Sequence, residues 1–291
     1  RATRPAGGPP RVGEGGSQYI EFAGVKKVYR MGEQEIEALA GVDFGIDKGQ
    51  FVIIAGASGA GKSTLLNILG GMDTATSGTI HLDGAELSAY SPRQMVDYRR
   101  YDVGFVFQFY NLIPNLTARE NVELASQVGR DPLDIDEVMA SVGLADRVAN
   151  FPSQLSGGEQ QRVAIAVGIA NEPRVLLADE PTGELDDETS AHVLEAMRDV
   201  NRELGVTTLI VTHDPAVSEH VARTVQIRDG RTATEVLRST RRDESGAEHH
   251  VAEEYAVLDR VGRLQLPDEF VTALDLRQRV RLALEADHVG V

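Results

Sequence analysis

The 291-residue chain contains no cysteine and no tryptophan, and only 5% of its residues are aromatic. Without cysteine it can form no disulfide framework, no thiolate metal site and no cysteine redox centre, which fits a reducing compartment. Long apolar runs are also missing: stretches such as Phe51–Ala57 and Val175–Ala178 fall far short of the roughly 20 residues that a membrane-spanning helix needs. We therefore expect a globular chain that does not span a membrane.

Positive charge is scarce as well. Lys and Arg together number 29 against 45 Asp and Glu, which gives a formal net charge of −16. This balance disfavours non-specific binding of the body of the protein to nucleic acid or to an anionic membrane surface, and leaves a local basic patch open. The apolar fraction of 42% is ample for a buried core, and the length allows one large domain with a small one.

Composition divides the chain into four segments. Residues 1–17 are rich in Gly, Pro and Arg and lack the apolar stretch of a signal peptide, so we expect a disordered leader there. A main domain follows over 18–235, and its part from about 91 to 150 has the spacing of a helical insertion. Residues 236–254 are charged and polar, which predicts a linker, and 255–291 form a small C-terminal unit.

Within the main domain the apolar pattern changes along the chain. Between residues 19 and 48 apolar and polar residues alternate in short runs, which is typical of half-exposed antiparallel strands. Phe51–Ala55 is continuously apolar and leads through a Gly-rich turn into the helix-like Ser63–Leu69, the order of a parallel α/β sheet. Val175–Ala178 and Thr207–Val211 repeat the buried-strand pattern, and polar residues follow each. Since open α/β sheets bind ligands at the carboxyl ends of their strands, we expect the site there.

The Gly-rich turn matches the phosphate-binding loop GxxxxGK[ST] in the strand-to-helix context that this motif requires. Its glycines let backbone N–H groups surround phosphates, and the helix N-terminus adds a favourable dipole. Lys62 would reach the terminal phosphates, and the Ser63 hydroxyl would ligate Mg²⁺. The alternative is a Gly-rich turn with a chance lysine. The nucleotide-binding residues predicted here are Gly56, Ala57, Ser58, Gly59, Ala60, Gly61, Lys62, Ser63 and Thr64.

Two adjacent acids close the apolar strand Val175–Ala178. Asp179 could hold Mg²⁺ through water, and Glu180 could face the water that attacks the γ-phosphate. Phosphoryl transfer asks a protein mainly for positioning and charge neutralisation, so these two carboxylates suffice. Elsewhere such a pair would usually be a solvated turn, but beside a phosphate loop we interpret it as catalytic.

Two further side chains follow apolar strands. His213 comes after Thr207–Val211, at a level where a neutral imidazole could contact the γ-phosphate and orient the water; a structural histidine is the alternative. Gln108 comes after Val103–Phe107, where its amide could reach Mg²⁺ or the attacking water; otherwise it is a surface loop glutamine. The predicted metal-binding residues are thus Ser63, Gln108 and Asp179, with ATP and Mg²⁺ as cofactors.

A Gly-Ser patch, Leu155-Ser156-Gly157-Gly158-Glu159, lies between the phosphate loop and the acidic pair. It could hold the γ-phosphate of a second nucleotide, which implies that two chains close face to face over ATP. We therefore expect half an active site in each chain.

The full set resembles the ATP-binding cassette (ABC) transporter ATPases, whose motifs occur in the same order. The resemblance implies an α/β P-loop NTPase fold of ABC type: a parallel-sheet core, an antiparallel β subdomain and a helical subdomain, here with a small C-terminal β-rich domain. It also implies that Tyr29 stacks on adenine, that Glu180 is the catalytic base and that Gln108 and His213 are the Q-loop glutamine and switch histidine.

The same resemblance implies what a second subunit contributes. Ser156, Gly157, Gly158 and Glu159 would form the signature that binds the nucleotide held by the other subunit, so they would act in trans. Gly183–Asp186 would be the D-loop, with Asp186 among the nucleotide-binding residues. Two departures from the family pattern are Val167-Gly168, where Arg-Ala is usual, and Glu184, where Asn or Ala is common. Glu184 could alter communication between the two sites.

Three segments, Leu69–Asp73, Asn111–Val122 and Glu180–Gly183, resemble the macrolide-efflux, lipoprotein-release and cell-division group of this family. That resemblance implies a homodimeric ATPase at the cytoplasmic face of the cell membrane, held there by a separately encoded four-helix permease and coupled to export or mechanotransmission. The alternative is a soluble ABC ATPase acting on DNA or ribosomes, with nucleic acid otherwise an unlikely partner because of the acidic balance.

The C-terminal unit has a pattern of its own. Residues 255–270 predict strand, turn, strand and helix start, and 279–284 predict another strand. This resembles the AbrB-like swapped-hairpin fold, with Gly262-Arg263 at the turn and Leu266-Pro267 before the helix. So short a unit favours an intertwined dimer. Three roles are open: a dimerisation clamp, a DNA-binding module or an inert appendage. The arginines that the second role would use are Arg260, Arg263, Arg277, Arg279 and Arg281.

Overall fold

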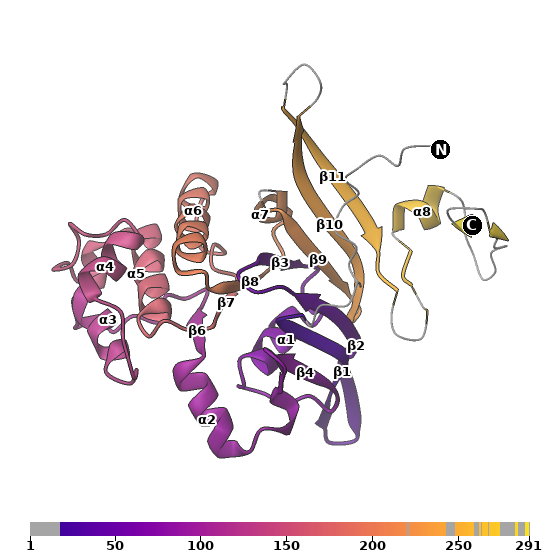
Figure 1. Cartoon of the computed structure of the whole chain (residues 1–291), viewed down its shortest axis with the longest axis horizontal. Coiled ribbons are helices and arrows are strands. Elements are labelled where there is room, and N and C mark those ends of the chain that lie inside the picture. The colour runs from indigo at the N-terminus through magenta and orange to yellow at the C-terminus, as the bar shows by residue number, and fades with distance from the viewer. Residues whose placement is uncertain are drawn as a thin grey trace, which may run out of the picture.

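The computed structural model describes residues 18–219, 221–242, 248–258, 262, 264–266, 268–273, 283–284 and 289–290. The predicted leader at 1–17 lies outside the described residues. Within them, no helix is both long enough and apolar enough to cross a membrane. Most of the described chain folds around one large mixed sheet with helices on both faces (Figure 1).

Antiparallel strands open the sheet. The alternating pattern over 19–48 predicts β1 (Ile20–Met31) and β2 (Gln34–Ile46), and the structure adds β4 (Ser77–Leu82) and β5 (Ala85–Glu86), which were not predicted. β1 pairs with β2 on one side and with β4 on the other. Phe22 lies opposite Phe44 across the β1–β2 pair, with ring centroids 4.6 Å apart. The alternation of apolar and polar residues therefore buries one face of these strands and leaves the other face more open.

Parallel strands form the centre of the sheet. They are β3 (Phe51–Ala55), β6 (Val103–Val106), β7 (Val175–Asp179) and β8 (Thr207–Thr212), joined at one side by β9 (Arg223–Arg228). Their order is β9-β3-β8-β7-β6, and every neighbouring pair is parallel. Ala55 lies opposite Thr212, and Asp179 lies opposite Val211, so the carboxyl ends of these strands meet at one edge. This confirms the predicted fold class.

Each central strand is apolar throughout because both of its faces are covered. Val52 and Ile54 of β3 belong to one core cluster, together with apolar residues of helix α1 (Lys62–Leu69) and of the antiparallel strands. Ile53 points to a second cluster, which contains apolar residues of helices α5 (Gly157–Ile169) and α6 (Asp187–Leu204). Two helical layers thus hold the strand ends, and the loops after them, in fixed positions.

The region from 91 to 150 contains helices α2 (Pro92–Tyr101), α3 (Ala118–Ser126) and α4 (Ile135–Ser141). It also contains β6, so it is a helical segment interrupted by one strand of the parallel sheet. Short 3₁₀ turns lie just before and just after this region, at Leu87–Ala89 and Pro152–Gln154.

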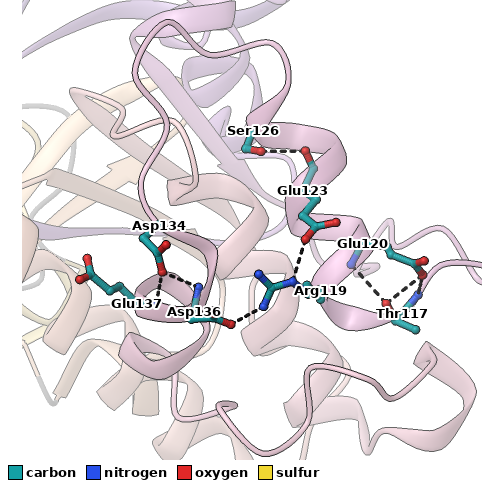
Figure 2. Close-up of polar contacts among 8 residues, drawn as sticks. All are labelled: Thr117, Arg119, Glu120, Glu123, Ser126, Asp134, Asp136 and Glu137. Carbon is teal, nitrogen blue, oxygen red and sulfur yellow. Dashed lines mark hydrogen bonds and ion pairs between the residues drawn. The ribbon is translucent and has the colours of Figure 1, made fainter.

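Local hydrogen bonds fix where these helices begin (Figure 2). Thr117 caps α3 in a capping box, its hydroxyl accepting from the backbone N–H of Glu120 while the Glu120 carboxylate accepts from that of Thr117. Arg119 then contacts Glu123 within α3 and Asp136 at the start of α4. Arg119 therefore links the two helices at the surface, while buried residues of both, such as Val122 of α3 and Met139 of α4, belong to the same apolar cluster.

Helix α7 (Pro215–Glu219) follows β8, and two long strands, β10 (Arg231–Arg242) and β11 (Glu248–Ala256), then form a hairpin that continues the large sheet (Figure 1). β10 also pairs antiparallel with β9, and Leu237 lies opposite both Arg223 of β9 and Glu253 of β11. The predicted linker at 236–254 is therefore wrong for the strand residues within it. Charged residues fit one face of an antiparallel pair as well as they fit a linker, so composition could not separate the two.

Beyond β11 the described residues include helix α8 (Asp268–Ala273) and the two-residue strands β12 (Ala283–Leu284) and β13 (Val289–Gly290), which pair with each other. α8 begins where the sequence predicts a short helix. Tyr255, predicted to open a separate unit, instead lies in β11 and pairs with Glu235 of β10. The five tail arginines lie outside the described residues, and the swapped-hairpin fold stays a prediction.

Candidate functional site

The predicted phosphate loop joins the end of β3 to the start of α1. Gly59 and Gly61 have φ of 80° and 102°, a region that favours glycine. At Gly61 an added Cβ would lie 2.4 Å from the carbonyl oxygen of Ala38, so the backbone is also too close for a side chain. Gly61 precedes α1 without a side-chain cap, which leaves the first N–H groups of the helix free for an anion.

Lys62 is buried, and its ammonium group lies over this loop. Nζ donates to the carbonyl oxygens of Gly56 at 2.8 Å and Ala57 at 3.0 Å. An ammonium group has three donor hydrogens, so a phosphate oxygen can take a hydrogen bond that these carbonyls do not use. The pocket beside it has a volume of about 210 Å³. Its lining residues are Ala38, Ser58, Gly59, Gly61, Lys62, Ser63, Thr64, Glu180 and His213.

Ser63 and Asp179, two of the predicted metal ligands, lie together. The Ser63 hydroxyl donates to Oδ1 of Asp179 at 3.0 Å. Burial raises the pKa of Asp179, and the charge of Glu180 adds to this, while the Ser63 hydrogen bond and the charge of Lys62 oppose it. In the described part of the chain, no three His, Cys, Asp or Glu side chains are placed so that they could hold a metal ion by themselves. A hydroxyl, one carboxylate and phosphate oxygens are nevertheless the ligands that Mg²⁺ takes in nucleotide sites, so the residues present fit it.

Glu180 is held by three contacts to the end of β8. Its Oε1 lies 2.8 Å from Nδ1 of His213, and its Oε2 accepts from the hydroxyl of Thr212 at 2.9 Å and the backbone N–H of His213 at 3.3 Å. Glu180 also has φ of 47°, which is uncommon for a residue with a side chain and often marks a functional position. Glu180 and His213, two of the predicted catalytic residues, are thus adjacent, and Thr212, which sequence reasoning missed, orients Glu180.

Gln108 lies at the neighbouring turn instead of in the pocket. Its Nε2 donates to Oε1 of Glu184 at 2.9 Å, and Gln108 is not among the residues that line the phosphate pocket. Because β6 runs parallel to β7, the residues after it, including Gln108, lie at the same edge of the sheet as Glu180. Its partner Glu184 was noted in the sequence as a departure, but nothing in the local pattern indicated this contact.

The Gly-Ser patch forms the N-terminus of α5. Ser156 caps the helix, and the Glu159 carboxylate accepts from the Ser156 backbone N–H at 2.8 Å, which with the Ser156 hydroxyl lowers the pKa of Glu159. At Gly158 an added Cβ would lie 2.3 Å from Cγ2 of Thr189, so the glycine allows α5 to pack against α6. Neither Ser156, Gly157 nor Gly158 lines the pocket beside Lys62. One chain therefore does not bring these two phosphate-binding elements together.

Tyr29, the predicted adenine-stacking residue, is part of a small charged cluster. Its hydroxyl donates to Oδ2 of Asp73 at 2.7 Å, and Nζ of Lys27 lies 4.8 Å from its ring centroid while bonding Oδ1 of Asp73 at 2.5 Å. Burial alone would raise the pKa of Asp73, but the hydrogen bonds from Lys27 and Tyr29 lower it. The pKa of Tyr29 is raised by the burial of Tyr29 and by its hydrogen bond to Asp73. Sequence reasoning missed Lys27 and Asp73, whose effect is to orient the ring.

Asp186, a predicted nucleotide-binding residue, caps α6. Its Oδ1 accepts from the backbone N–H of Thr189 at 2.8 Å, and this bond and others to backbone N–H groups lower the pKa of Asp186. The cap fixes the end of the turn that begins at Glu180, so the D-loop residues Gly183 and Glu184 are held between two anchored positions.

Comparison with known proteins gives the family. The ABC transporter model matches residues 39–183. Over 224 residues the chain is 41% identical to the macrolide export ATP-binding/permease protein MacB of Rhodopirellula baltica, covering 75% of this chain and 33% of MacB. It is 43% identical to YknY of Bacillus subtilis, named as an uncharacterised ABC transporter ATP-binding protein, over 72% of this chain and 94% of YknY.

A solved structure is similar to this chain in both fold and sequence. It is the dimeric post-hydrolysis state of the ATP-binding cassette MJ0796 bound to ADP and Pi, with a TM-score of 0.66 and 41% identity over 74% of this chain and 97% of that one. The chain spans about a third of the MacB relative and nearly all of YknY and of the MJ0796 chain. The chain belongs to the ABC transporter family and is an ATP-binding, ATP-hydrolysing cassette of that family.

Proposed function

We propose that two copies of this chain close over two ATP molecules and thereby drive a separate membrane permease of the export or mechanotransmission type. The observation that carries the proposal is the separation of the two phosphate-binding elements: the N-terminus of α5 does not line the pocket that Lys62, Glu180 and His213 share. A second copy, placed face to face, would supply Ser156, Gly157, Gly158 and Glu159 to that pocket. The dimeric state of the related cassette MJ0796 supports this arrangement.

In the proposed site each chain binds ATP largely with its own residues. Backbone N–H groups of Gly56–Ser63, with Thr64, would hold the β- and γ-phosphates, and Lys62 would neutralise them. Tyr29, oriented by Asp73, would stack on adenine. Asp186 would support the facing signature by fixing the end of the D-loop.

Mg²⁺ would be held by Ser63 and Asp179, with Gln108 as a further ligand. When bound, the ion would neutralise charge on the phosphates. Burial raises the pKa of Asp179, so a nearby cation would relieve the cost of keeping this carboxyl ionised. Glu180 would accept the proton of the attacking water, and His213 would hold Glu180 in place through Nδ1.

A permease partner would place the protein at the cytoplasmic face of the cell membrane as a peripheral subunit. Support comes from the MacB relative, whose name joins an ATP-binding part to a permease and of which this chain matches 33%. Phe109 is 66% exposed directly after Gln108, so it is the best candidate for a permease contact. Tyr110 and Leu112, which follow shortly after it, are partly buried and fit that role less well.

The dimer is tested with the Glu180→Gln variant, which should bind ATP and hydrolyse it slowly. We expect ATP with Mg²⁺ to shift this variant towards the dimer, so that light scattering gives the dimer mass at lower protein concentrations with ATP than without it. A Ser156→Arg variant in the same background should bind ATP without this shift, because the bulky cation blocks the facing nucleotide. A mass that does not depend on ATP would contradict the proposal.

The permease is tested by purifying tagged Glu180→Gln protein from its native membranes in detergent with ATP and Mg²⁺. Recovery of a four-helix membrane protein would support mechanotransmission, and a permease with more helices would indicate an ordinary importer or exporter. Phe109→Ala should lower that recovery while ATP binding is kept. Recovery of DNA or ribosomes without any membrane protein would overturn the transporter role in favour of a soluble ABC ATPase.

A further inference from the structure

The turn after Glu180 brings a carboxylate to the amide of Gln108. The turn is tight, since the backbone N–H of Gly183 donates to the carbonyl oxygen of Glu180 at 3.0 Å and that of Leu185 to Thr182 at 3.1 Å. Gly183 makes room for the amide, because a Cβ there would lie 3.1 Å from Nε2 of Gln108. The next residue, Glu184, accepts the hydrogen bond from that same Nε2 at 2.9 Å.

The chemistry of the pair fixes which way the amide faces. An ionised carboxylate only accepts hydrogen bonds, whereas a side-chain amide donates through nitrogen and accepts through oxygen. Glu184 therefore binds the NH₂ group of Gln108 and leaves the amide oxygen available to a cation. A neutral Asn or Gln at position 184 could bond either end of the amide, and Ala could bond neither. An acid at this position therefore selects the orientation that leaves the amide oxygen free.

The charge of Glu184 also acts on a second residue of the same segment. Burial raises the pKa of Tyr110, and the negative charge of Glu184 adds to this. The Tyr110 hydroxyl in turn lies against the N-terminus of α5, where a Cβ added to Gly157 would be 2.8 Å from it. Glu184 thus lies where the segment after β6, the turn after β7 and the start of α5 converge.

We propose that Glu184 is a positioning residue that holds the Gln108 amide with its oxygen free to ligate Mg²⁺. The inference rests on the proposed role of Gln108 in the Mg²⁺–ATP site. It gives a physical reason for an acid in a turn that is already rich in negative charge, because Glu180, Asp186, Asp187 and Glu188 all lie within four positions of Glu184 in the sequence. Without such a contact, another carboxylate here would only add repulsion.

The test measures metal binding rather than turnover. Mn²⁺ replaces Mg²⁺ as a paramagnetic probe, and its affinity for the complex of the full chain with a non-hydrolysable ATP analogue is obtained by electron paramagnetic resonance. Glu184→Ala and Glu184→Gln should each weaken Mn²⁺ binding, by roughly threefold to tenfold for the loss of one oriented ligand contact. Binding of the analogue without metal should not change.

Two further variants separate positioning from general effects. Glu188→Gln removes the same charge from the first turn of α6, outside the Gln108 hydrogen bond, and should leave Mn²⁺ affinity unchanged. In a Gln108→Ala background, Glu184→Ala should cause no additional loss, since the residue through which it acts is gone. Unchanged affinity in Glu184→Ala, or an equal loss with and without Gln108, would overturn the positioning role.

The measurement also distinguishes this proposal from the proposed function. Failure of the Glu180→Gln chain to dimerise with ATP would overturn the dimeric transporter ATPase. The Mn²⁺ comparison is made on a nucleotide complex before any turnover, so its outcome is independent of dimer formation and of a permease.

Discussion

Oε1 of Glu180 lies 2.8 Å from Nδ1 of His213, and both residues line the same pocket as Lys62. A carboxylate that accepts from Nδ1 fixes the tautomer of the ring and leaves Nε2 as the free ring nitrogen. The exposed fraction of the Glu180 side chain is 15% and that of His213 is 60%, so the acid is the more buried member of the pair. The two residues act as one unit, which the strand order β7–β8 brings together.

Thr212 completes this unit, and Thr212→Val should slow ATP hydrolysis. The hydroxyl donates to Oε2 of Glu180 at 2.9 Å, and valine has nearly the same shape without the donor. Losing one hydrogen bond to a charged group should lower kcat by roughly fivefold to tenfold with little change in KM. Thr208→Val serves as the control, because Thr208 is buried on the same strand and its hydroxyl donates to the carbonyl oxygen of Val206 instead of to Glu180. An equal loss in both variants would show that β8 itself had been damaged.

The raised pKa of Asp179 predicts a pH dependence of stability. Its ordinary value is 3.8, and in the folded chain it lies higher because of burial. Between these two values the folded state binds more protons than the unfolded state, so this group makes folding less favourable as pH rises through that window. Asp179→Asn keeps an oxygen for Ser63 but does not titrate. The variant should therefore gain stability relative to wild type as pH is raised above about 4, measured by urea unfolding without metal.

The same variant should lose stabilisation by the ligand. For a site that binds only the folded state, a ligand at a hundredfold excess over Kd contributes about 2.7 kcal/mol. ATP with Mg²⁺ should raise the unfolding midpoint of wild type more than that of Asp179→Asn, while ATP with EDTA should raise both alike. An equal response to Mg²⁺ in both proteins would exclude Asp179 as a ligand.

Gly158→Ala should destabilise the chain because the added methyl group has no room. Its Cβ would lie 2.3 Å from Cγ2 of Thr189, a branched side chain that cannot turn away easily. Overpacking of this kind costs about 1 to 3 kcal/mol, more than alanine gains over glycine in a helix. Thr189→Ser removes the colliding methyl group, so the double variant should recover most of the loss. Without that recovery, the cause lies elsewhere on α5.

The C-terminal clamp hypothesis is best tested by ending the chain after Leu258. A cut at 251 would remove most of β11 and uncover β10, whereas 258 keeps the whole pairing from Thr234↔Ala256 to Arg242↔Glu248. If 259–291 form a dimerisation clamp, the shortened chain should lose any nucleotide-independent dimer that the full chain forms. Unchanged mass in sedimentation would reject the clamp, and loss of DNA binding in the shortened chain would favour the DNA-binding role instead.

The sequence predicted several features that depend on neighbouring residues. The phosphate loop was predicted from its glycines, and Gly59 and Gly61 adopt positive φ inside it. The capping box that Ser156 and Glu159 form at the start of α5 was not predicted, although it also depends on residues only a few positions apart. The buried runs of β3, β7 and β8 were clear, because a strand covered on both faces must be apolar throughout.

Composition gave a wrong prediction for residues 236–254, because a high content of charged residues does not distinguish a linker from a strand. Residues 236–254 are charged in either a linker or a half-exposed hairpin, and only the pairing of β10 with β9 and β11 decides between them. Likewise, nothing near Gln108 indicates Glu184, which is 76 positions away. Contacts of this kind depend on the order of strands in the sheet, which residue patterns specify only indirectly.

The sequence by itself determined the chemistry available to this protein: the phosphate loop, the two carboxylates, the histidine and the Gly-Ser patch, each encoded within a few residues. Only the tertiary structure decided which of these groups meet. It places Lys62, Ser63, Asp179, Glu180 and His213 at one edge because β3, β7 and β8 are parallel neighbours, and it places Ser156–Gly158 elsewhere, at the start of α5. The reason is physical. Loops and helix caps are fixed by contacts between residues close in sequence, whereas strand order results from burying the whole apolar core.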